Sequence, residues 1–299
     1  MLRIFRGTGF SNRFALEEFS LTVGEALAHG TRVLAEAGID TARLESELLL
    51  ARACDDCARA LLYMELQREL APESREAYEE LLQRRARREP LAYILGHWGF
   101  RRLTLKTDKR ALVPRPETEM VVERALEHLN GVKEPAVLDV GTGTGAIALA
   151  IVDEHPRAQV TAIDVSEDAI ALARENLDLL GINGRVRLVE HDLTEGLGDD
   201  EFDLVVSNPP YIEPEDIDRL QPEVRDWEPR IALVAHGATE AVARAATEAL
   251  RPGGWVVLEI AENQAGRVTG VLRELGYGDV RVSPDLAGRD RVIEGRWGG

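Results

Sequence analysis

Residues 136–150 read AVLDVGTGTGAIALA, and the glycine-rich centre of this stretch, DVGTGTG (139–145), decides the fold. A short apolar run, a cluster of glycines and a second apolar run with helical spacing predict a buried strand, a tight loop and a helix. Glycines let the backbone pass close to a ligand, and the free N–H groups at the start of a helix favour a negatively charged group. The loop by itself also fits a dinucleotide site, because Gly141, Gly143 and Ala146 satisfy G-x-G-x-x-G/A, or a plain tight turn.

Strand and helix signals alternate along the chain from about residue 117 to residue 299. Buried parallel strands read as short continuous apolar runs, and helices of this spacing form the crossovers between them. The pattern predicts a doubly wound, Rossmann-like α/β domain with a seven-stranded sheet and an antiparallel end. The runs, in order, are AVLDV, GAIALAIVDE, QVTAID, EDAIALARENLDLLG, RVRLVEHD, FDLVVSN, a helix near 238–250, WVVLEI, a helix near 263–275, DVRVS and RVIEG.

The chain before this domain has a different pattern. Residues 21–89 carry apolar residues at spacings of three and four without a strand signal, which predicts a small α-helical bundle. Residues 90–116 mix short β-like runs with glycines and predict a β-hairpin linker with a charged turn at residues 107–109. Residues 1–20 lack a continuous apolar core and a small-residue cleavage site, so we interpret them as an N-terminal extension without a secretory signal.

Composition excludes several classes of protein. With 44% hydrophobic and 30% charged residues, and no window near the roughly 18 apolar residues of a membrane span, the sequence predicts a cytoplasmic protein without a membrane partner. The net charge of −17 opposes attraction to phosphate backbones, so we expect no direct nucleic-acid partner. Cys54 and Cys57 form a lone CDDC without further ligands nearby, so we expect reduced thiols and no metal.

Two acidic residues follow the next two predicted strands. Asp164 closes the predicted strand within TAIDVS (161–166), where a carboxylate can accept hydrogen bonds from the ribose of an adenosyl or dinucleotide cofactor. Asp192 closes the next predicted strand within LVEHDL (188–193), where it can accept from an adenine amino group while Leu193 packs on the ring; the alternative role for Asp192 is a turn or helix cap. Both positions favour a nucleoside-containing cofactor at the edge of the sheet.

A second motif, SNPPY (207–211), directly follows the apolar run FDLVV. Two prolines lack N–H groups for a strand ladder and lock their own backbone, so the strand must end there. The motif lies at the carboxyl edge, where open α/β sheets bind ligands. Combined with the glycine loop, it resembles the amino-methyltransferase branch of S-adenosylmethionine-dependent enzymes, in which an Asn-Pro-Pro-Tyr loop holds a planar NH2 group of adenine, cytosine or glutamine.

The residue types of this loop suit methylation of a planar nitrogen. The lone pair of such a nitrogen is delocalised, so it attacks poorly unless its two hydrogens are held and the nitrogen is aimed at the methyl group. The side-chain oxygen of Asn208 and the backbone carbonyl of Pro209 supply two acceptors, and the stiffness of Pro209 and Pro210 keeps them aimed. Tyr211 can lie against the flat amide face and exclude water. These four residues are the catalytic candidates, without a dedicated general base.

The segment ALVPRPETEM (111–120) joins the two halves and narrows the family. Together with YILGHWGF (93–100), DVGTGTGAIALA, SNPPYI and RPGGWVVLEI (251–260), it resembles the PrmC (HemK) family over about residues 21–295. The resemblance implies an enzyme that methylates the side-chain amide nitrogen (N5) of the glutamine in the Gly-Gly-Gln loop of class I peptide chain release factors, which tunes translation termination. It implies S-adenosylmethionine as cofactor, and the helical bundle as a docking module for the protein substrate.

The resemblance also assigns the cofactor pocket. The glycine loop takes the methionine part, Asp164 the ribose, and Asp192 with Leu193 the adenine, while Phe100 and residues 115–119 line the pocket. The full set of candidate cofactor-binding residues is Phe100, Arg115, Thr118, Asp139, Gly141, Thr142, Gly143, Thr144, Gly145, Asp164, Val165, Asp192, Leu193 and Asn208. Two stretches depart from the family pattern: AHGATEA (235–241) stands where many members have GGxDG, and Ala261 replaces the glycine of EIG.

Three alternatives remain. An adenine-N6 or cytosine-N4 nucleic-acid methyltransferase also uses such a loop, but residues 195–228 contain twelve acidic and two basic residues, which repel a phosphate backbone. A protein that binds the cofactor without catalysis has no use for acceptors aimed at an NH2 group. A dinucleotide-dependent oxidoreductase fits the glycines but not SNPPY.

Overall fold

The structure is a computed structural model that describes residues 21–182, 184–197 and 201–299. The chain divides into two compact units, Met1–Arg87 and Arg88–Gly299, each of which we describe by itself. The predicted N-terminal extension, residues 1–20, lies outside the described residues. Among the described helices, none is long and apolar enough to cross a membrane.

The described part of the first unit is helical, as its spacing predicts. Its helices are α1 (Val23–Glu36), α2 (Ala42–Ala53), α3 (Arg59–Met64) and α4 (Pro72–Ala86). A capping box at Thr22 and Glu25 starts α1, and proline occupies the first position of α4. Tyr78 of α4 is 1% exposed and shares a 2.7 Å hydrogen bond with Ser46 of α2. A Cβ on Gly30 would lie 2.0 Å from the Tyr78 hydroxyl, so the three helices meet at a glycine.

A short helix and a hairpin open the second unit. They are α5 (Leu91–Leu95), β1 (His97–Phe100) and β2 (Leu103–Lys106). The hairpin is predicted, but its turn is not at residues 107–109: Phe100 pairs with Leu103, so Arg101 and Arg102 form the turn, and Arg101 takes a positive φ of 50°. The charged stretch at 107–109 follows the second strand. The reason is burial, because Phe100, Leu103 and Leu105 all lie in the core and fix the register of the strands.

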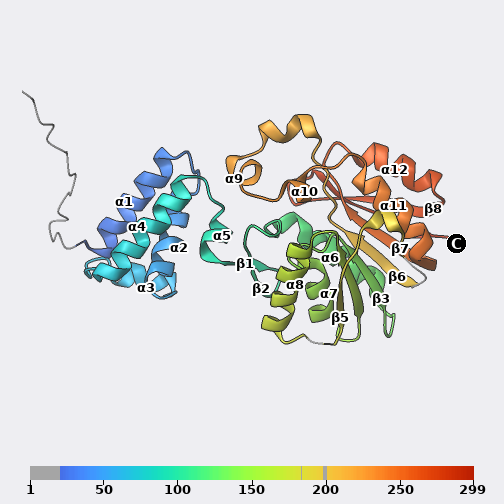
Figure 1. Ribbon diagram of the computed structural model, residues 1–299, viewed down its shortest axis with the longest axis horizontal. Helices are drawn as coiled ribbons and strands as arrows, with labels where there is room; N and C mark the ends of the chain where they lie inside the picture. The colour runs from blue at the N-terminus through green and yellow to red at the C-terminus, as the bar shows by residue number, and fades with distance from the viewer. Residues whose placement is uncertain (1–20, 183, 198–200) are drawn as a thin grey trace, which may run out of the picture. The chain divides into compact units, whose positions relative to one another are not determined.

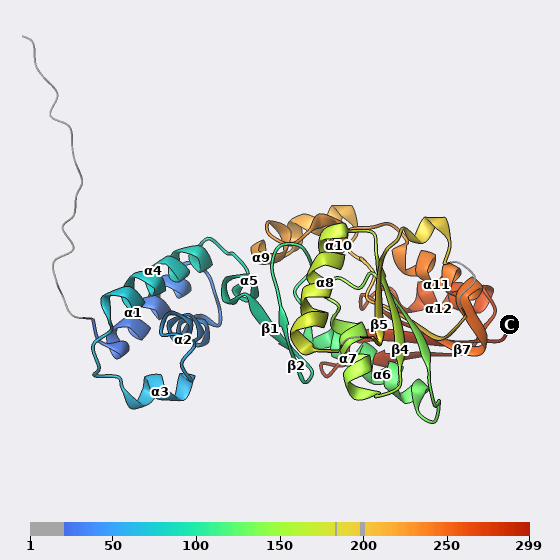
Figure 2. The same ribbon diagram turned by 60° about the horizontal axis from the view of Figure 1, so that its bottom comes forward.

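The second unit is built on a seven-stranded sheet with the order β5-β4-β3-β6-β7-β9-β8 (Figure 1 and Figure 2). Its strands are β3 (Ala136–Val140), β4 (Gln159–Asp164), β5 (Val186–Glu190), β6 (Phe202–Ser207), β7 (Leu250–Glu259), β8 (Tyr277–Pro284) and β9 (Asp290–Trp297). The pairs from β5 to β7 are parallel, and β9 is antiparallel to both β7 and β8. This confirms the doubly wound sheet with an antiparallel end.

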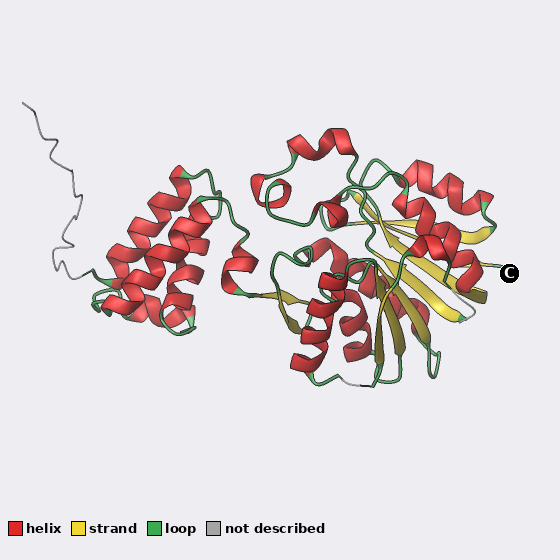
Figure 3. Ribbon diagram, viewed as in Figure 1, coloured by secondary structure: helices red, strands yellow, loops and turns green. Residues whose placement is uncertain are grey.

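Helices cover both faces of the sheet (Figure 3). One face carries α6 (Glu119–Leu129), α7 (Ala146–Glu154) and α8 (Glu167–Leu180), and the other carries α11 (Ala238–Ala249) and α12 (Ala265–Glu274). Each face has its own core because successive side chains of a strand point to opposite sides. Thus Val137 packs with residues of α6 and α7, while the next residue, Leu138, packs with residues of α11 and α12.

Short turns and helices fill three connections of the second unit. The connection between β2 and α6 contains the 3-10 turn η1 (Pro116–Thr118), and η2 (Leu193–Glu195) follows β5. After β6 come η3 (Pro214–Arg219), α9 (Pro222–Arg225) and α10 (Arg230–Leu233). Arg115 donates to Glu228 at 2.6 Å, and the Glu228 side chain is 1% exposed. This partly buried ion pair fastens the connection after β6 to the segment that precedes α6.

Candidate functional site

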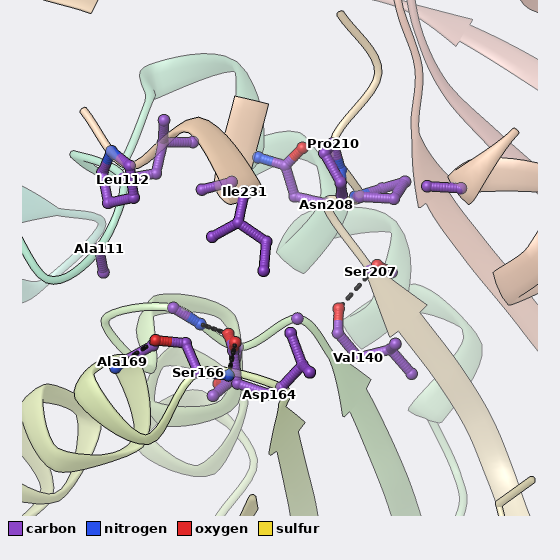
Figure 4. Close-up of a pocket in the computed structure, with 18 of the residues that line it drawn as sticks. Ala111, Leu112, Val140, Asp164, Ser166, Ala169, Ser207, Asn208, Pro210 and Ile231 are labelled. Atoms are coloured by element: carbon purple, nitrogen blue, oxygen red, sulfur yellow. Dashed lines mark hydrogen bonds between the residues drawn. The ribbon is translucent and has the colours of Figure 1, made fainter. Parts of the chain in front are cut away.

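The two motifs predicted to hold ligands lie side by side at one edge of the sheet. The glycine loop follows β3 and SNPPY ends β6, and these two strands are neighbours. The chain turns away from them in opposite directions, to β4 on one side and to β7 on the other, which makes this point the switch of a doubly wound sheet. The Ser207 hydroxyl donates to the Val140 carbonyl at 2.7 Å and ties the two strand ends together (Figure 4).

A cavity of about 460 Å³ opens over this switch point. It brings together most of the candidate residues, from five separate segments of the chain. Those that line it are Arg115, Thr118, Gly141, Thr142, Gly143, Thr144, Asp164, Val165, Asp192, Leu193, Asn208, Pro209 and Pro210. The first turn of α7 also reaches the cavity through Ala146 and Ile147, so the N–H end of that helix borders it.

The glycine loop has the conformation that its composition predicts. Gly141, Gly143 and Gly145 all have positive φ, between 56° and 82°. At Gly145, which precedes α7, a Cβ would also lie 3.0 Å from a methyl carbon of Leu149, so close packing adds to the preference for glycine that the positive φ creates. Gly141 and Gly143, which line the cavity, offer only backbone to it, because glycine has no side chain.

Two carboxylates support this loop. Asp164 accepts from the backbone N–H groups of Gly143 (2.9 Å) and Ser166 (3.0 Å), and it borders the cavity (Figure 4). Asp139 is fully buried beneath the loop and accepts from the Thr142 hydroxyl at 2.7 Å through one oxygen, while its other oxygen has no partner among the described residues. Burial without full compensation raises the pKa of Asp139 to about 7. Asp164 is thus placed to meet a ligand, and Asp139 to hold the loop.

The adenine candidates occupy the side of the cavity nearest β5. Asp192 and Leu193 both line it. Asp192 also accepts from the backbone N–H and the hydroxyl of Thr194, each at 2.8 Å, and so caps η2. The cap and the cavity position are compatible, because a carboxylate has more acceptor sites than these two bonds use.

Asn208, Pro209 and Pro210 separate two hollows. They line the large cavity and also a second one of about 340 Å³, whose wall includes Tyr211, Gln221 and Leu233. The Asn208 amide nitrogen donates to the Thr118 hydroxyl at 3.1 Å. The motif therefore forms a stiff wall with one cavity on each side, as a site joining two ligands requires.

Four candidates do not line the large cavity. Phe100 is 1% exposed and belongs to the core formed with residues of α6 and α7, so in the structure it does not border the cavity as the resemblance implied. Asp139 is buried beneath the glycine loop, and Gly145 is the last residue of that loop, directly before α7. Tyr211 borders the second cavity and a third, and its hydroxyl donates to Glu259.

Both departures from the family pattern are accommodated. In AHGATEA, Gly237 has a φ of 67° and precedes α11, while Ala235, Ala238 and Ala241 contribute to the wall of the large cavity. Ala261 lies in the wall of the third cavity, and its backbone N–H donates to Gln264 at 3.1 Å. An alanine side chain at 261 leaves that backbone bond in place.

Sequence reasoning missed residues whose partners are distant along the chain. Glu259 and Gln264 bind Tyr211 through its hydroxyl and its carbonyl. Ile231 of α10 projects into the large cavity and is 59% exposed (Figure 4). One signal was visible for Glu259, namely a charge at the end of the otherwise apolar strand WVVLEI.

Two family models and several known proteins match the sequence of this chain. The family model described as PrmC N-terminal domain matches residues 25–96, and the model described as Methyltransferase small domain matches residues 119–222. The chain is 43% identical to the release factor glutamine methyltransferase of Geobacter sulfurreducens, with 93% of this chain and 97% of that protein covered. It is 40% identical to the protein of the same name from Caulobacter vibrioides, with 92% and 96% covered.

Among solved structures, a release-factor-specific protein-(glutamine-N5) methyltransferase from Alicyclobacillus acidocaldarius is 31% identical. The match covers 62% of this chain and 95% of that one, with a TM-score of 0.37. Identity of about 40% over nearly the full length of the relatives decides the relationship. This chain belongs to the family of release factor glutamine methyltransferases.

Proposed function

We propose that this protein transfers a methyl group from S-adenosylmethionine to the N5 side-chain nitrogen of the glutamine in the Gly-Gly-Gln motif of class I peptide chain release factors. One observation carries the proposal: Asn208, Pro209 and Pro210 form a wall shared by two cavities. A cofactor in the larger cavity and a glutamine side chain in the smaller one would meet at this wall.

The larger cavity suits the cofactor. Its wall combines backbone N–H groups of the glycine loop and the Asp164 carboxylate with large apolar side chains that water now reaches, Val165 (49% exposed) and Ile231 (59% exposed). A flat adenine ring would cover such side chains, and ribose hydroxyls would donate to Asp164. We therefore assign the nucleoside end to Asp164, Val165 and Asp192.

The wall residues prepare the amide nitrogen for attack. The Oδ1 atom of Asn208 and the carbonyl of Pro209 accept the two N–H hydrogens, which fixes the plane of the amide and aims its nitrogen. When bound, the cofactor supplies a methyl group on a sulfonium: the N–C bond forms as the C–S bond breaks, S-adenosylhomocysteine leaves, and the nitrogen loses one proton to water. Proline keeps both acceptors in place without reorganisation.

Charge and architecture favour a protein substrate. The connection after β6, which borders the smaller cavity, is strongly acidic and would attract a basic protein loop while repelling nucleic acid. We infer that the helical unit docks the release factor, because its helix α3 exposes three large apolar side chains, Leu61, Tyr63 and Met64. A translation factor as substrate places the reaction in the cytoplasm.

The test is transfer of labelled methyl from S-adenosylmethionine to a class I release factor, beside a release factor whose Gly-Gly-Gln glutamine is alanine. We expect label on the first protein only. Label on both would move the target away from that glutamine. No label on either, with cofactor binding intact, would refute the proposal and direct the search to nucleic-acid substrates and then to a non-catalytic role.

The docking role has its own test. Met64→Glu places a charge at a side chain that is 79% exposed, so the fold should tolerate it. We expect the KM for the release factor to rise about threefold to tenfold, with the Kd for S-adenosylmethionine unchanged. An unchanged KM would remove α3 from the docking surface.

A further inference from the structure

A buried carboxylate, Glu259, lies next to the SNPPY motif and accepts hydrogen bonds from two residues around it. Glu259 is the last residue of β7 and is 1% exposed. Its Oε2 atom accepts from the Thr118 hydroxyl at 2.6 Å, and its Oε1 atom accepts from the Tyr211 hydroxyl at 3.0 Å. Glu259 thus joins the segment before α6 to the last residue of the SNPPY motif.

The hydrogen bond between Thr118 and Glu259 fixes how Thr118 can interact with Asn208. A hydroxyl has one proton to donate, and at Thr118 that proton goes to Glu259. The oxygen of Thr118 can then only accept from Asn208, so the NH2 group of Asn208 faces Thr118, at 3.1 Å. The Oδ1 atom, on the other side of the amide, is left for a substrate.

We propose that Glu259, acting through Thr118, is a positioning residue that sets the orientation of the Asn208 amide so that Oδ1 rather than NH2 meets the substrate amide. This rests on the proposed function. A neutral side chain that can donate at position 259 would allow both hydrogen bonds of Thr118 to reverse direction. Thr118 would then accept from residue 259 and donate to the Oδ1 atom of Asn208. The NH2 group of Asn208 would then face the NH2 group of the glutamine, two donors in opposition.

The charge of Glu259 is set by groups from three neighbouring segments. Arg291 of β9 favours the carboxylate, Glu117 of η1 opposes it, and the Tyr211 hydroxyl donates to it. Burial is the largest influence and raises the pKa of Glu259 above its ordinary value. The orienting charge is therefore lost as pH falls through that raised pKa, and methyl transfer should fall with it.

The decisive variant is Glu259→Gln, which keeps the shape but can donate to Thr118. We expect kcat to fall by about tenfold to a hundredfold, while the Kd for S-adenosylmethionine stays within about threefold, since Glu259 does not line the cofactor cavity. Thr118→Val should give a similar loss of kcat and Thr118→Ser should restore it, because serine keeps the hydroxyl. A merely structural role does not predict this rescue.

Glu294→Gln is the matched control. Glu294 is an equally buried carboxylate of the same sheet, paired with Arg124 and His128 and remote from the wall residues in its contacts. We expect this variant to lose stability but to keep kcat. A loss of kcat in Glu294→Gln as large as in Glu259→Gln would overturn the proposal, and so would parental kcat in Glu259→Gln.

The pH profile adds a readout that damage to the fold would not produce. The acid limb of kcat should be missing in Glu259→Gln. In Tyr211→Phe, which removes one donor to the carboxylate, the limb should move to higher pH. An acid limb that is identical in the parent and both variants would overturn the role of Glu259.

A spectroscopic measurement separates this inference from the proposed function. The side-chain NH2 resonances of Asn208, assigned by their loss in Asn208→Ala, should shift in Glu259→Gln and Thr118→Val but not in Glu294→Gln. If the parent protein transfers no methyl group, the proposed function fails, and these shifts still decide whether Glu259 orients Asn208. Unchanged resonances in Glu259→Gln would overturn the inference whatever the activity.

Discussion

The glycine loop and the SNPPY motif follow neighbouring strands and solve opposite problems. The glycine loop needs conformations that other residues avoid, and its three glycines all have positive φ. The second motif needs a backbone that does not move, and two prolines supply it. The first offers N–H donors to a ligand, and the second offers oxygen acceptors. The comparison teaches that neighbouring strands of one sheet can end in loops of opposite design, one that needs positive φ angles and one that needs a fixed backbone.

The two loops share one device, a buried carboxylate behind each. Asp139 accepts from Thr142 behind the glycine loop, and Glu259 accepts from Thr118 and Tyr211 behind the proline motif. Burial raises the pKa of both carboxyl groups. In each case a threonine hydroxyl connects the carboxylate to the loop: Thr142 is part of the glycine loop, and Thr118 accepts a hydrogen bond from Asn208.

Removing the acceptor of the stiff motif should have the largest effect. In Asn208→Ala we expect methyl transfer to fall about a hundredfold or more, with cofactor binding near normal, because a positioned polar group is lost from the wall. Single-turnover assays and cofactor titration measure the two quantities. The control is Asn263→Ala, an exposed asparagine in the wall of the third cavity. Equal turnover in Asn208→Ala would remove Asn208 from the reaction.

Removing the carboxylate at the rim of the glycine loop should act on binding instead. In Asp164→Ala we expect S-adenosylmethionine binding to weaken by about 1–3 kcal/mol, through the lost ribose contact and the freed N–H of Gly143. Calorimetric titration measures this, with Asp168→Ala on the exposed start of α8 as control. Unchanged affinity would place the ribose elsewhere.

The carboxylate beneath the glycine loop should reveal itself through pH. The pKa of Asp139 in the fold, about 7, exceeds its ordinary value of 3.8, so its protonated form stabilises the fold at low pH, and that contribution is lost as pH rises through about 7. As pH rises from 5 to 8, we expect the free energy of unfolding of the parent to fall by about 1–3 kcal/mol relative to that of Asp139→Asn, because asparagine does not titrate.

Urea unfolding followed by tryptophan fluorescence measures the difference. All four tryptophans, at 98, 227, 255 and 297, lie in the second unit, so the signal reports on that unit alone. Asp178→Asn on α8 is the exposed control and should follow the parent at both pH values. Parallel pH dependence in Asp139→Asn and the parent would contradict the raised pKa.

Loosening the stiff motif should have the smallest effect. A proline restricts the residue before it, so Pro210 fixes the direction of the Pro209 carbonyl. In Pro210→Ala we expect kcat to fall roughly twofold to fivefold with cofactor affinity unchanged. Pro214→Ala at the start of η3 is the control. A rate equal to the parent's would show that packing, rather than proline, holds the carbonyl.

Much of the fold follows from local patterns. Every strand and helix named from the alternation of the second unit is present, as are the helices of the first unit. The hairpin was predicted with its turn in the wrong place, because the charged stretch at 107–109 looks more like a turn than Arg101 and Arg102 do. The register depends on the burial of Phe100 and Leu103, which the local sequence does not state.

By itself, the sequence determined the glycine loop, the SNPPY motif and the sheet edge that they share, because glycine and proline act through their own backbones and parallel strands end on one side. Only the tertiary structure decided which buried side chains form hydrogen bonds to residues of these loops and their neighbours. Thr118 and Glu259 are 141 positions apart, and Tyr211 and Glu259 are 48 apart. Such contacts depend on which strands become neighbours in the sheet. That choice is made by long-range packing, so no local pattern reveals that one buried carboxylate orients the asparagine of the proline motif.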